Sequence, residues 1–132
     1  MTIDKMYDLF ALCLSELPAS YPKPRLVVHE SPESLVEFMG DAPHAFRRAN
    51  AFSAGLVMGM ADAKRNAIHI PHTTIASEGL LELLDLLLHE CGHLYQAHKH
   101  GAGSPRYLDE RLANAFARRW SRRLKRKALQ LG

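Results

Sequence analysis

The chain is organised around residues 86–95, which read LLLHECGHLY and set the pattern H-E-x-x-H inside an apolar run. On a helix of 3.6 residues per turn, His89 and His93 lie one turn apart on the same face. Two imidazole nitrogens held side by side can share one metal ion such as Zn²⁺. Glu90 is the residue type that takes a proton from water activated by such an ion. Because the neighbouring residues are uncharged, the pattern predicts a metal site on a largely buried helix.

Length and composition bound the class of protein. With 132 residues, 47% of them hydrophobic and 23% charged, we expect one globular domain over residues 1–132. The two cysteines, Cys13 and Cys91, indicate no disulfide framework, so we interpret both as free thiols in a reducing compartment. No stretch reads as a signal peptide or as a membrane span. We therefore expect a soluble cytoplasmic protein that has no membrane partner.

The first part of the chain predicts a helix, a strand and a second helix. Thr2 can cap a helix with apolar residues at the spacing of a buried face: Ile3, Met6, Tyr7, Phe10, Cys13, Leu14 and Leu17. Pro18 ends this helix, and residues 25–29 form a short β-prone run. Ser31 can cap a short helix that Gly40 stops, and residues 41–50 predict a loop or a short helical turn.

Two apolar runs, at 51–60 and 67–70, flank the polar stretch 62–66 and predict a β-hairpin. Gly55 and Gly59 weaken the first strand of this hairpin, or mark a place where another backbone approaches closely.

Two helices are predicted to complete the chain. Thr74 or Ser77 can cap the leucine-rich helix, which we expect to end at Gly101. A last helix begins near Ser104, with apolar residues at every fourth position: Leu108, Leu112, Phe116, Trp120 and Leu124. The order helix, strand, helix, hairpin, helix, helix predicts a small α+β domain, with a sheet of about three strands on one side of the leucine-rich helix.

A catalytic zinc site needs three protein ligands, so a third must come from elsewhere in the chain. Gln96 and Lys99 exclude a continuation of the motif as H-x-x-G-x-x-H. His100 shares the face of His93 but lies about 10 Å further along the helix axis, and His98 lies on another face. The third ligand is therefore expected from another element.

Glu110, at the start of the last helix, is the better candidate for the third ligand. Asn114 follows it by one turn on the same face, where its side chain can accept a hydrogen bond from the far nitrogen of a ligand histidine. The small residues Ala113 and Ala117 would let this helix approach the histidine helix closely.

The two motifs H-E-x-G-H and E-x-x-A-N-x-F-A, in this order over residues 89–117, resemble the zincin metallopeptidases of the gluzincin type. The resemblance is closest to the ImmA/IrrE family of small bacterial and phage-related enzymes that cleave regulatory proteins such as repressors. The short minigluzincins are a second possible relative. The chain departs from the family's pattern after the second motif, where it reads RRWSRR at 118–123, and no helix-turn-helix partner domain is evident.

The resemblance implies a zincin-like fold and a role for each residue of the two motifs. The ligands would be His89, His93 and Glu110, with Glu90 as the catalytic base and Asn114 as the residue that orients a ligand. The expected activity is that of a zinc metalloendopeptidase with a specific protein substrate, such as a regulatory protein. One Zn²⁺ is expected, with another divalent transition metal such as Mn²⁺ as the alternative.

An extended substrate is expected to pair with a free hairpin edge, at the strand over 68–70 or its neighbour. The donor for the oxyanion stays open among Tyr107, Tyr95, His72 and Arg106. The remaining histidines without a spacing argument are expected to be solvated or satisfied by neighbours: His29, His44 and His69.

Residues 118–132 form a basic helical tail. Positions 118–127 hold seven of the seventeen basic residues and no acidic one, which leaves ten basic and fourteen acidic residues, a net charge of −4, elsewhere. We interpret this tail as the solvated face of an amphipathic helix, although nucleic acid or an acidic partner is an alternative. Nucleic acid is not favoured, because Trp120 is the only aromatic residue among these basic residues and it belongs to the apolar stripe that we expect to face the core. The alternative function is a non-catalytic, metal-stabilised regulatory protein that binds partners or nucleic acid through this helix.

Overall fold

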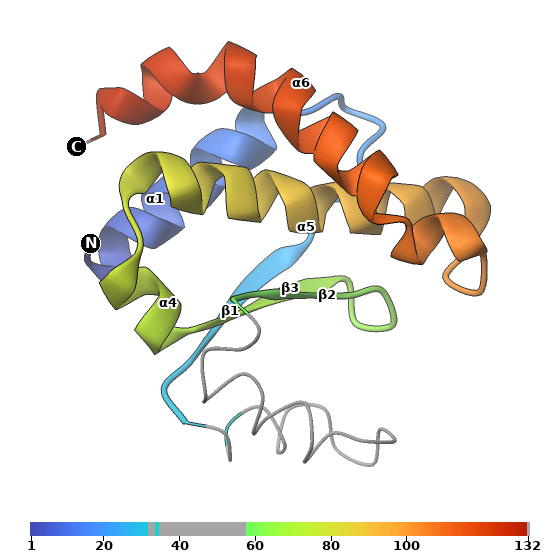
Figure 1. The fold of residues 1–132 in the computed structure, drawn as a ribbon, viewed down its shortest axis with the longest axis horizontal. Coiled ribbons are helices and arrows are strands. Elements are labelled where there is room, and N and C mark those ends of the chain that lie inside the picture. The colour runs from blue at the N-terminus through green and yellow to red at the C-terminus, as the bar shows by residue number, and fades with distance from the viewer. Residues whose placement is uncertain (32–33, 35–57, 132) are drawn as a thin grey trace.

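The computed structural model describes residues 1–31, 34 and 58–131 (Figure 1). In chain order its elements are α1 (Ile3–Glu16), β1 (Arg25–His29), β2 (Met60–Asp62), β3 (Ala67–Pro71), α4 (His72–Ser77), α5 (Leu80–His100), the 3₁₀-helix η1 (Pro105–Leu108) and α6 (Glu110–Leu129). The four α-helices and the three-stranded sheet of the described residues confirm the predicted α+β class. Most of the helix predicted after Ser31, the loop at 41–50 and residues 51–57 of the first hairpin strand lie outside the described residues.

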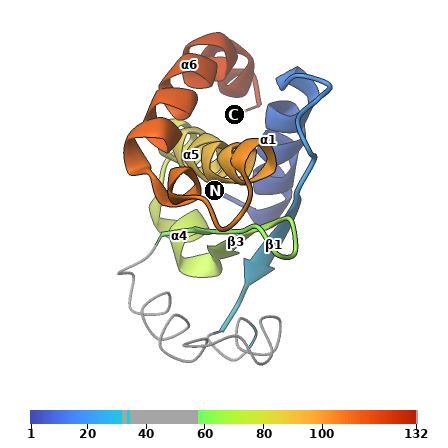
Figure 2. The same ribbon diagram turned by 90° about the vertical axis from the view of Figure 1, so that its right-hand side faces the viewer.

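The central element is α5, which lies between the sheet and α6 and has α1 beside it (Figure 1; Figure 2). Leu83, Leu84, Leu87 and Leu88 have no exposed surface and share one broad face of the helix. The helix contacts α1, α6, η1 and the strands β2 and β3, as expected for a central, largely buried helix. The helix ends at Gly101, whose φ of 92° lies in the left-handed region that favours glycine.

The predicted start of α5 is wrong. Residues 72–77 form a separate short helix, α4, and α5 begins only after Gly79. The Thr74 hydroxyl does not cap α5, because it donates to the backbone carbonyl of Met58 at 2.9 Å. The Ser77 hydroxyl donates to the Thr74 carbonyl at 3.4 Å, within its own helix. Both side chains therefore have local partners that the sequence pattern does not reveal.

The sheet has the order β1-β3-β2, with β3 parallel to β1 and antiparallel to β2. The predicted hairpin is confirmed for β2 and β3, which are joined by a turn in which Asn66 adopts a φ of 48°. The sequence predicts a free edge at residues 68–70 or at the neighbouring strand. The first alternative is wrong, because β3 has a strand on each side. The neighbouring strand β2 pairs with β3 alone within the described part of the chain, so its outer edge has no strand partner there.

Helices α5 and α6 touch at their backbones. A Cβ added to Gly92 would lie 3.0 Å from the Cα of Ala113 and 3.1 Å from its carbonyl oxygen. This distance is tighter than nine in ten real Cβ contacts, so a side chain at position 92 would press on the α6 backbone, and glycine permits the close approach. The close approach expected from Ala113 is thus confirmed, with Gly92 as its counterpart.

A chain of buried polar side chains connects the three strands. His69 lies 2.9 Å from an oxygen of Asp62 through Nε2 and 2.8 Å from Nε2 of His29 through Nδ1. The other ring nitrogen of His29 lies 3.0 Å from the Ser34 hydroxyl. Both histidines are buried and satisfied by neighbours rather than solvated, while His44 lies outside the described residues. Because burial and the adjacent ring of His69 disfavour the charged form, the pKa of His29 is lowered to about 4.

Replacing Gly92 by Ala should destabilise the fold, although Ala is the better helix former. The added methyl group meets the Ala113 backbone, which cannot move without shifting α6. We expect a net loss of about 1–3 kcal/mol in the free energy of unfolding, measured by urea denaturation. Gly103→Ala is the matched control, because a Cβ at Gly103 has no atom within 4 Å. Equal stability of the two variants would contradict the close contact.

The free energy of unfolding should fall as pH decreases from about 6.5 to about 4. Above this pH range, His29 is neutral in both the folded and the unfolded chain. Within the range, His29 of the unfolded chain has its ordinary pKa and is protonated, whereas His29 of the folded chain stays neutral, so protonation favours the unfolded state. The lowered pKa of His29 corresponds to a loss of up to about 3 kcal/mol in the free energy of unfolding, which urea denaturation in the presence of EDTA measures. His29→Gln should flatten this dependence, whereas the exposed control His72→Gln should retain it. An unchanged slope in His29→Gln would refute the assignment.

Candidate metal centre

Three side chains from two helices meet at one point. The Nε2 atom of His89 lies 2.8 Å from one oxygen of Glu110, and the Nε2 atom of His93 lies 3.1 Å from the other. The two Nε2 atoms are 3.2 Å apart, and the donor atoms of all three residues lie within 4.8 Å of one another. Among the described residues this is the one group of histidine, cysteine and carboxylate side chains with the spacing of a metal site.

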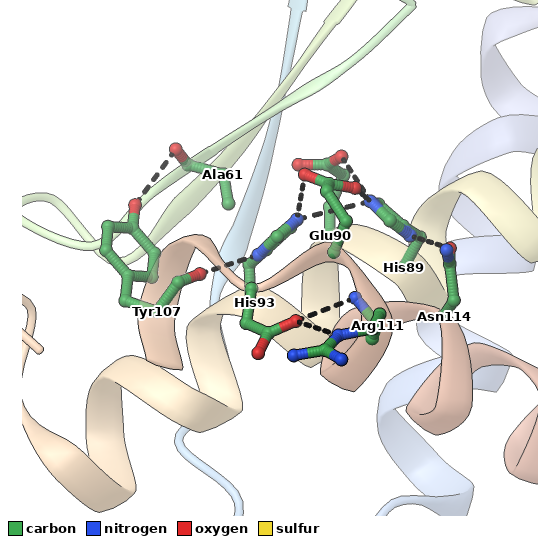
Figure 3. A network of polar contacts seen from close by, with 9 residues as sticks. Ala61, His89, Glu90, His93, Tyr107, Arg111 and Asn114 are labelled. Carbon is green, nitrogen blue, oxygen red and sulfur yellow. Dashed lines mark hydrogen bonds and ion pairs between the residues drawn. The ribbon is translucent and has the colours of Figure 1, made fainter. Parts of the chain in front are cut away.

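The far nitrogens of both rings are held by hydrogen bonds (Figure 3). The Nδ1 atom of His93 donates to the backbone carbonyl of Tyr107 at 2.6 Å, and Nδ1 of His89 lies 2.8 Å from the side-chain oxygen of Asn114. A backbone carbonyl can only accept, so neutral His93 carries its proton on Nδ1 and has a lone pair on Nε2. The Asn114 oxygen assigns the same tautomer to His89.

The donor set fits a cation. Two imidazole lone pairs and a carboxylate directed at one point repel one another unless a positive charge lies between them. Glu110 is two-thirds exposed, whereas the His93 side chain is 8% exposed, so the group opens to solvent on the side of α6. A divalent ion at this point would be held by His89, His93 and Glu110, the residues that the sequence predicts as ligands.

Local structure explains how the side chains converge. His89 and His93 share one face of α5 because they are four residues apart. Glu110 is the first residue of α6, and the side chain of Asp109 caps that helix by accepting a bond from the Arg111 N–H at 2.9 Å. The cap fixes where α6 begins and hence where Glu110 lies.

Glu90 lies beside the group and is almost completely buried. Its carboxylate is 4.0 Å from Nε2 of His89 and accepts a hydrogen bond from the backbone N–H of Ala61 in β2. Burial raises the pKa of the Glu90 carboxyl, although the two histidines and the Ala61 N–H act in the opposite direction. A carboxylate with a raised pKa next to a cation site has the property required of a general base near neutral pH.

A cleft of about 280 Å³ opens in front of these residues. One wall is Gly59 with the β2 residues Met60 and Ala61, and the other is formed by Tyr107 and Leu108 of η1. Glu90, His93 and Glu110 line it too, so the carboxylates and a ring of the candidate site face a space that a substrate could enter. Leu108 is 73% exposed and offers an apolar surface at the mouth of the cleft.

The hydroxyl of Tyr107, a possible oxyanion donor, is engaged by the backbone of the β2 region. It donates to the Ala61 carbonyl at 3.2 Å (Figure 3) and accepts from the Ala63 N–H at 3.2 Å. An oxyanion could receive this hydroxyl only after the bond to Ala61 breaks. Of the other candidates, Tyr95 packs on Phe116 with ring centroids 5.5 Å apart, and Arg106 lies 3.1 Å from His100 through Nη1. His72 is the exposed first residue of α4.

Cys91 does not belong to the group, although it lies within the motif. Its side chain is buried, and burial raises the pKa of its thiol to about 12, so the thiol stays protonated. Its backbone carbonyl accepts a hydrogen bond from the Tyr21 hydroxyl at 2.9 Å. The face of α5 with Cys91 packs in the core, whereas the face with His89 and His93 contributes to the candidate metal site.

Two contributors to the site are backbone groups that sequence reasoning missed. The Tyr107 carbonyl orients His93, and the Ala61 N–H binds the Glu90 carboxylate. Every residue has a carbonyl and nearly every residue has an N–H, so residue identity carries no mark of these roles. Only the position of η1 and β2 against α5 reveals them.

No helix among the described residues is long and apolar enough to cross a membrane. No model of a known protein family, no curated protein and no solved structure matches this chain.

Proposed function

We propose that this protein is a zinc-dependent metalloendopeptidase of zincin-like fold that cleaves a specific protein substrate, such as a regulatory protein. The observation that carries the proposal is the convergence of the His89 and His93 Nε2 atoms with the Glu110 carboxylate, beside the buried carboxylate of Glu90. Each of these side chains has a function in peptide hydrolysis, and the cleft gives a substrate access to them.

Two imidazoles and one carboxylate form a ligand set that zinc uses in hydrolases, and a fourth position is left for water or substrate. When bound, zinc would polarise the carbonyl of the substrate and lower the pKa of water towards 7. Asn114 and the Tyr107 carbonyl keep the two rings turned with Nε2 towards the ion. Mn²⁺ is the alternative ion, because imidazole and carboxylate ligands also accept it.

Glu90 acts as the general base. Its carboxylate removes a proton from the attacking water and then delivers that proton to the nitrogen of the leaving amine. The Ala61 N–H holds the carboxylate in place, and burial favours the neutral form that must exist between these two transfers.

The substrate would bind along the outer edge of β2 as an added strand. Both backbone groups of Ala61 are already engaged, the N–H by Glu90 and the carbonyl by Tyr107. Pairing would therefore use the backbone at Gly59, which precedes the strand and lines the same cleft. The exposed side chain of Leu108 on the opposite wall favours an apolar substrate residue at that position.

One zinc ion should bind per chain with an affinity that depends on the three ligands. Glu110→Gln and His93→Ala should lose stoichiometric binding, and Asn114→Ala should weaken binding about 10–100-fold, because the ring of His89 loses the acceptor that orients it. Calorimetric titration of the metal-free protein measures these affinities. His98→Gln, an exposed histidine on the same helix, is the control that should bind as the wild type does. Undiminished zinc binding by His93→Ala would exclude the assigned centre.

Glu90→Gln should keep zinc and lose hydrolysis by about 10²–10⁴-fold, because the amide cannot accept the proton of water. A peptide library derived from a bacterial proteome is the probe, and mass spectrometry of new peptide ends is the measurement. The exposed Glu82→Gln on the same helix should retain wild-type cleavage. A zinc-loaded wild type that cleaves no peptide in this library would favour the non-catalytic, metal-stabilised protein instead.

A further inference from the structure

The exposed face of α6 carries a concentrated positive charge that the metal site does not use. Seven basic residues between positions 118 and 127 are all exposed: Arg118, Arg119, Arg122, Arg123, Lys125, Arg126 and Lys127. The opposite face of the helix is buried through Trp120 and Leu124, as predicted. We call the seven side chains the basic face.

Few of these charges are neutralised. Within the described part of the chain, Lys127 forms an ion pair with Glu16, whereas the other six have no carboxylate within 4 Å. Arg119 and Arg123 lie over the ring of Trp120, at 5.8 and 5.0 Å from its centroid. The remaining four residues are exposed and have neither kind of contact with the described residues: Arg118, Arg122, Lys125 and Arg126.

This arrangement is not what solubility alone requires. A solvated helical face usually alternates acidic and basic residues at i,i+4, whereas α6 sets basic beside basic at 118–122, 119–123, 122–126 and 123–127. Like charges at this spacing destabilise a helix. The helix dipole compensates only in the last turn, so it does not account for the arginines in the middle of α6. A ligand of opposite charge would compensate all of them.

We propose that the basic face binds nucleic acid through its phosphate backbone. Five of the seven side chains are arginines, whose planar fork matches a phosphate. Residues 118–126 extend about 12 Å along the helix axis, which covers several phosphates of one strand.

An acidic protein fits the basic face less well than nucleic acid does. Protein interfaces need a buried aromatic or aliphatic anchor at their centre, and Trp120 is only 8% exposed because the core claims it. Interfaces with nucleic acid are polar and strongly positive, as this face is. Binding by the basic face requires neither zinc nor Glu90, so its test is independent of the proposed peptidase activity.

The test is the fluorescence anisotropy of a short labelled DNA duplex of mixed sequence, titrated with the full chain between about 50 and 200 mM salt. Two triple variants remove the same charge: R122Q/K125Q/R126Q on the basic face, and K5Q/K23Q/K99Q on exposed lysines elsewhere. The wild type should bind with an affinity that falls steeply with salt. The variant of the basic face should bind at least about 10-fold more weakly and show a salt slope smaller by about 2–3. The lysine variant should bind almost as the wild type does.

Three outcomes would overturn the proposal. They are no duplex binding by the wild type at about 50 mM salt, equal losses in both triple variants, and displacement of the duplex by polyglutamate as effectively as by unlabelled DNA. The last outcome would assign the face to an acidic protein. Thermal unfolding followed by circular dichroism checks that both variants are folded, and the single variant R122Q is the second probe of the same face.

Discussion

The contact between Gly92 and Ala113 is the constraint on which the rest of the site depends. His93 and Glu110 are 17 positions apart in sequence and belong to two different helices, and the close approach of the two helix backbones brings their side chains into one group. With a larger residue at position 92, Glu110 would be carried away from the two histidines as α6 moved outward. The glycine of the motif is thus a packing residue that determines the position of Glu110 at the candidate metal centre.

The site is built so that its charges are fixed before any ligand arrives. Hydrogen bonds hold the rings of His89 and His93 from behind, and a backbone N–H holds Glu90 from the side of the sheet. Each bond leaves the reactive atom of its side chain directed at the same small volume. The free energy that would otherwise be spent in ordering these groups is supplied by packing in the folded protein.

Much of the fold was predictable because local patterns decide it. Period and caps placed α1, β1, β3 and most of α5, and helical spacing put His89 beside His93 and Glu110 beside Asn114. The failures concern long-range partners. The Thr74 hydroxyl bonds to Met58 rather than capping a helix, and β3 lies inside the sheet because β1 pairs with it across a long gap in sequence. The roles of the Ala61 and Tyr107 backbones follow from packing that no sequence pattern encodes.

Tyr107 lies in one wall of the cleft and is hydrogen-bonded to the other. Its carbonyl holds a histidine of the metal group, and its hydroxyl holds the sheet edge against which a substrate would lie. A displacement of Tyr107 would therefore alter the orientation of the His93 ring and the position of the β2 edge together. In the proposed metallopeptidase, thermodynamic linkage would then make a peptide bound along this edge raise the affinity for the ion, and the ion would raise the affinity for the peptide by the same factor.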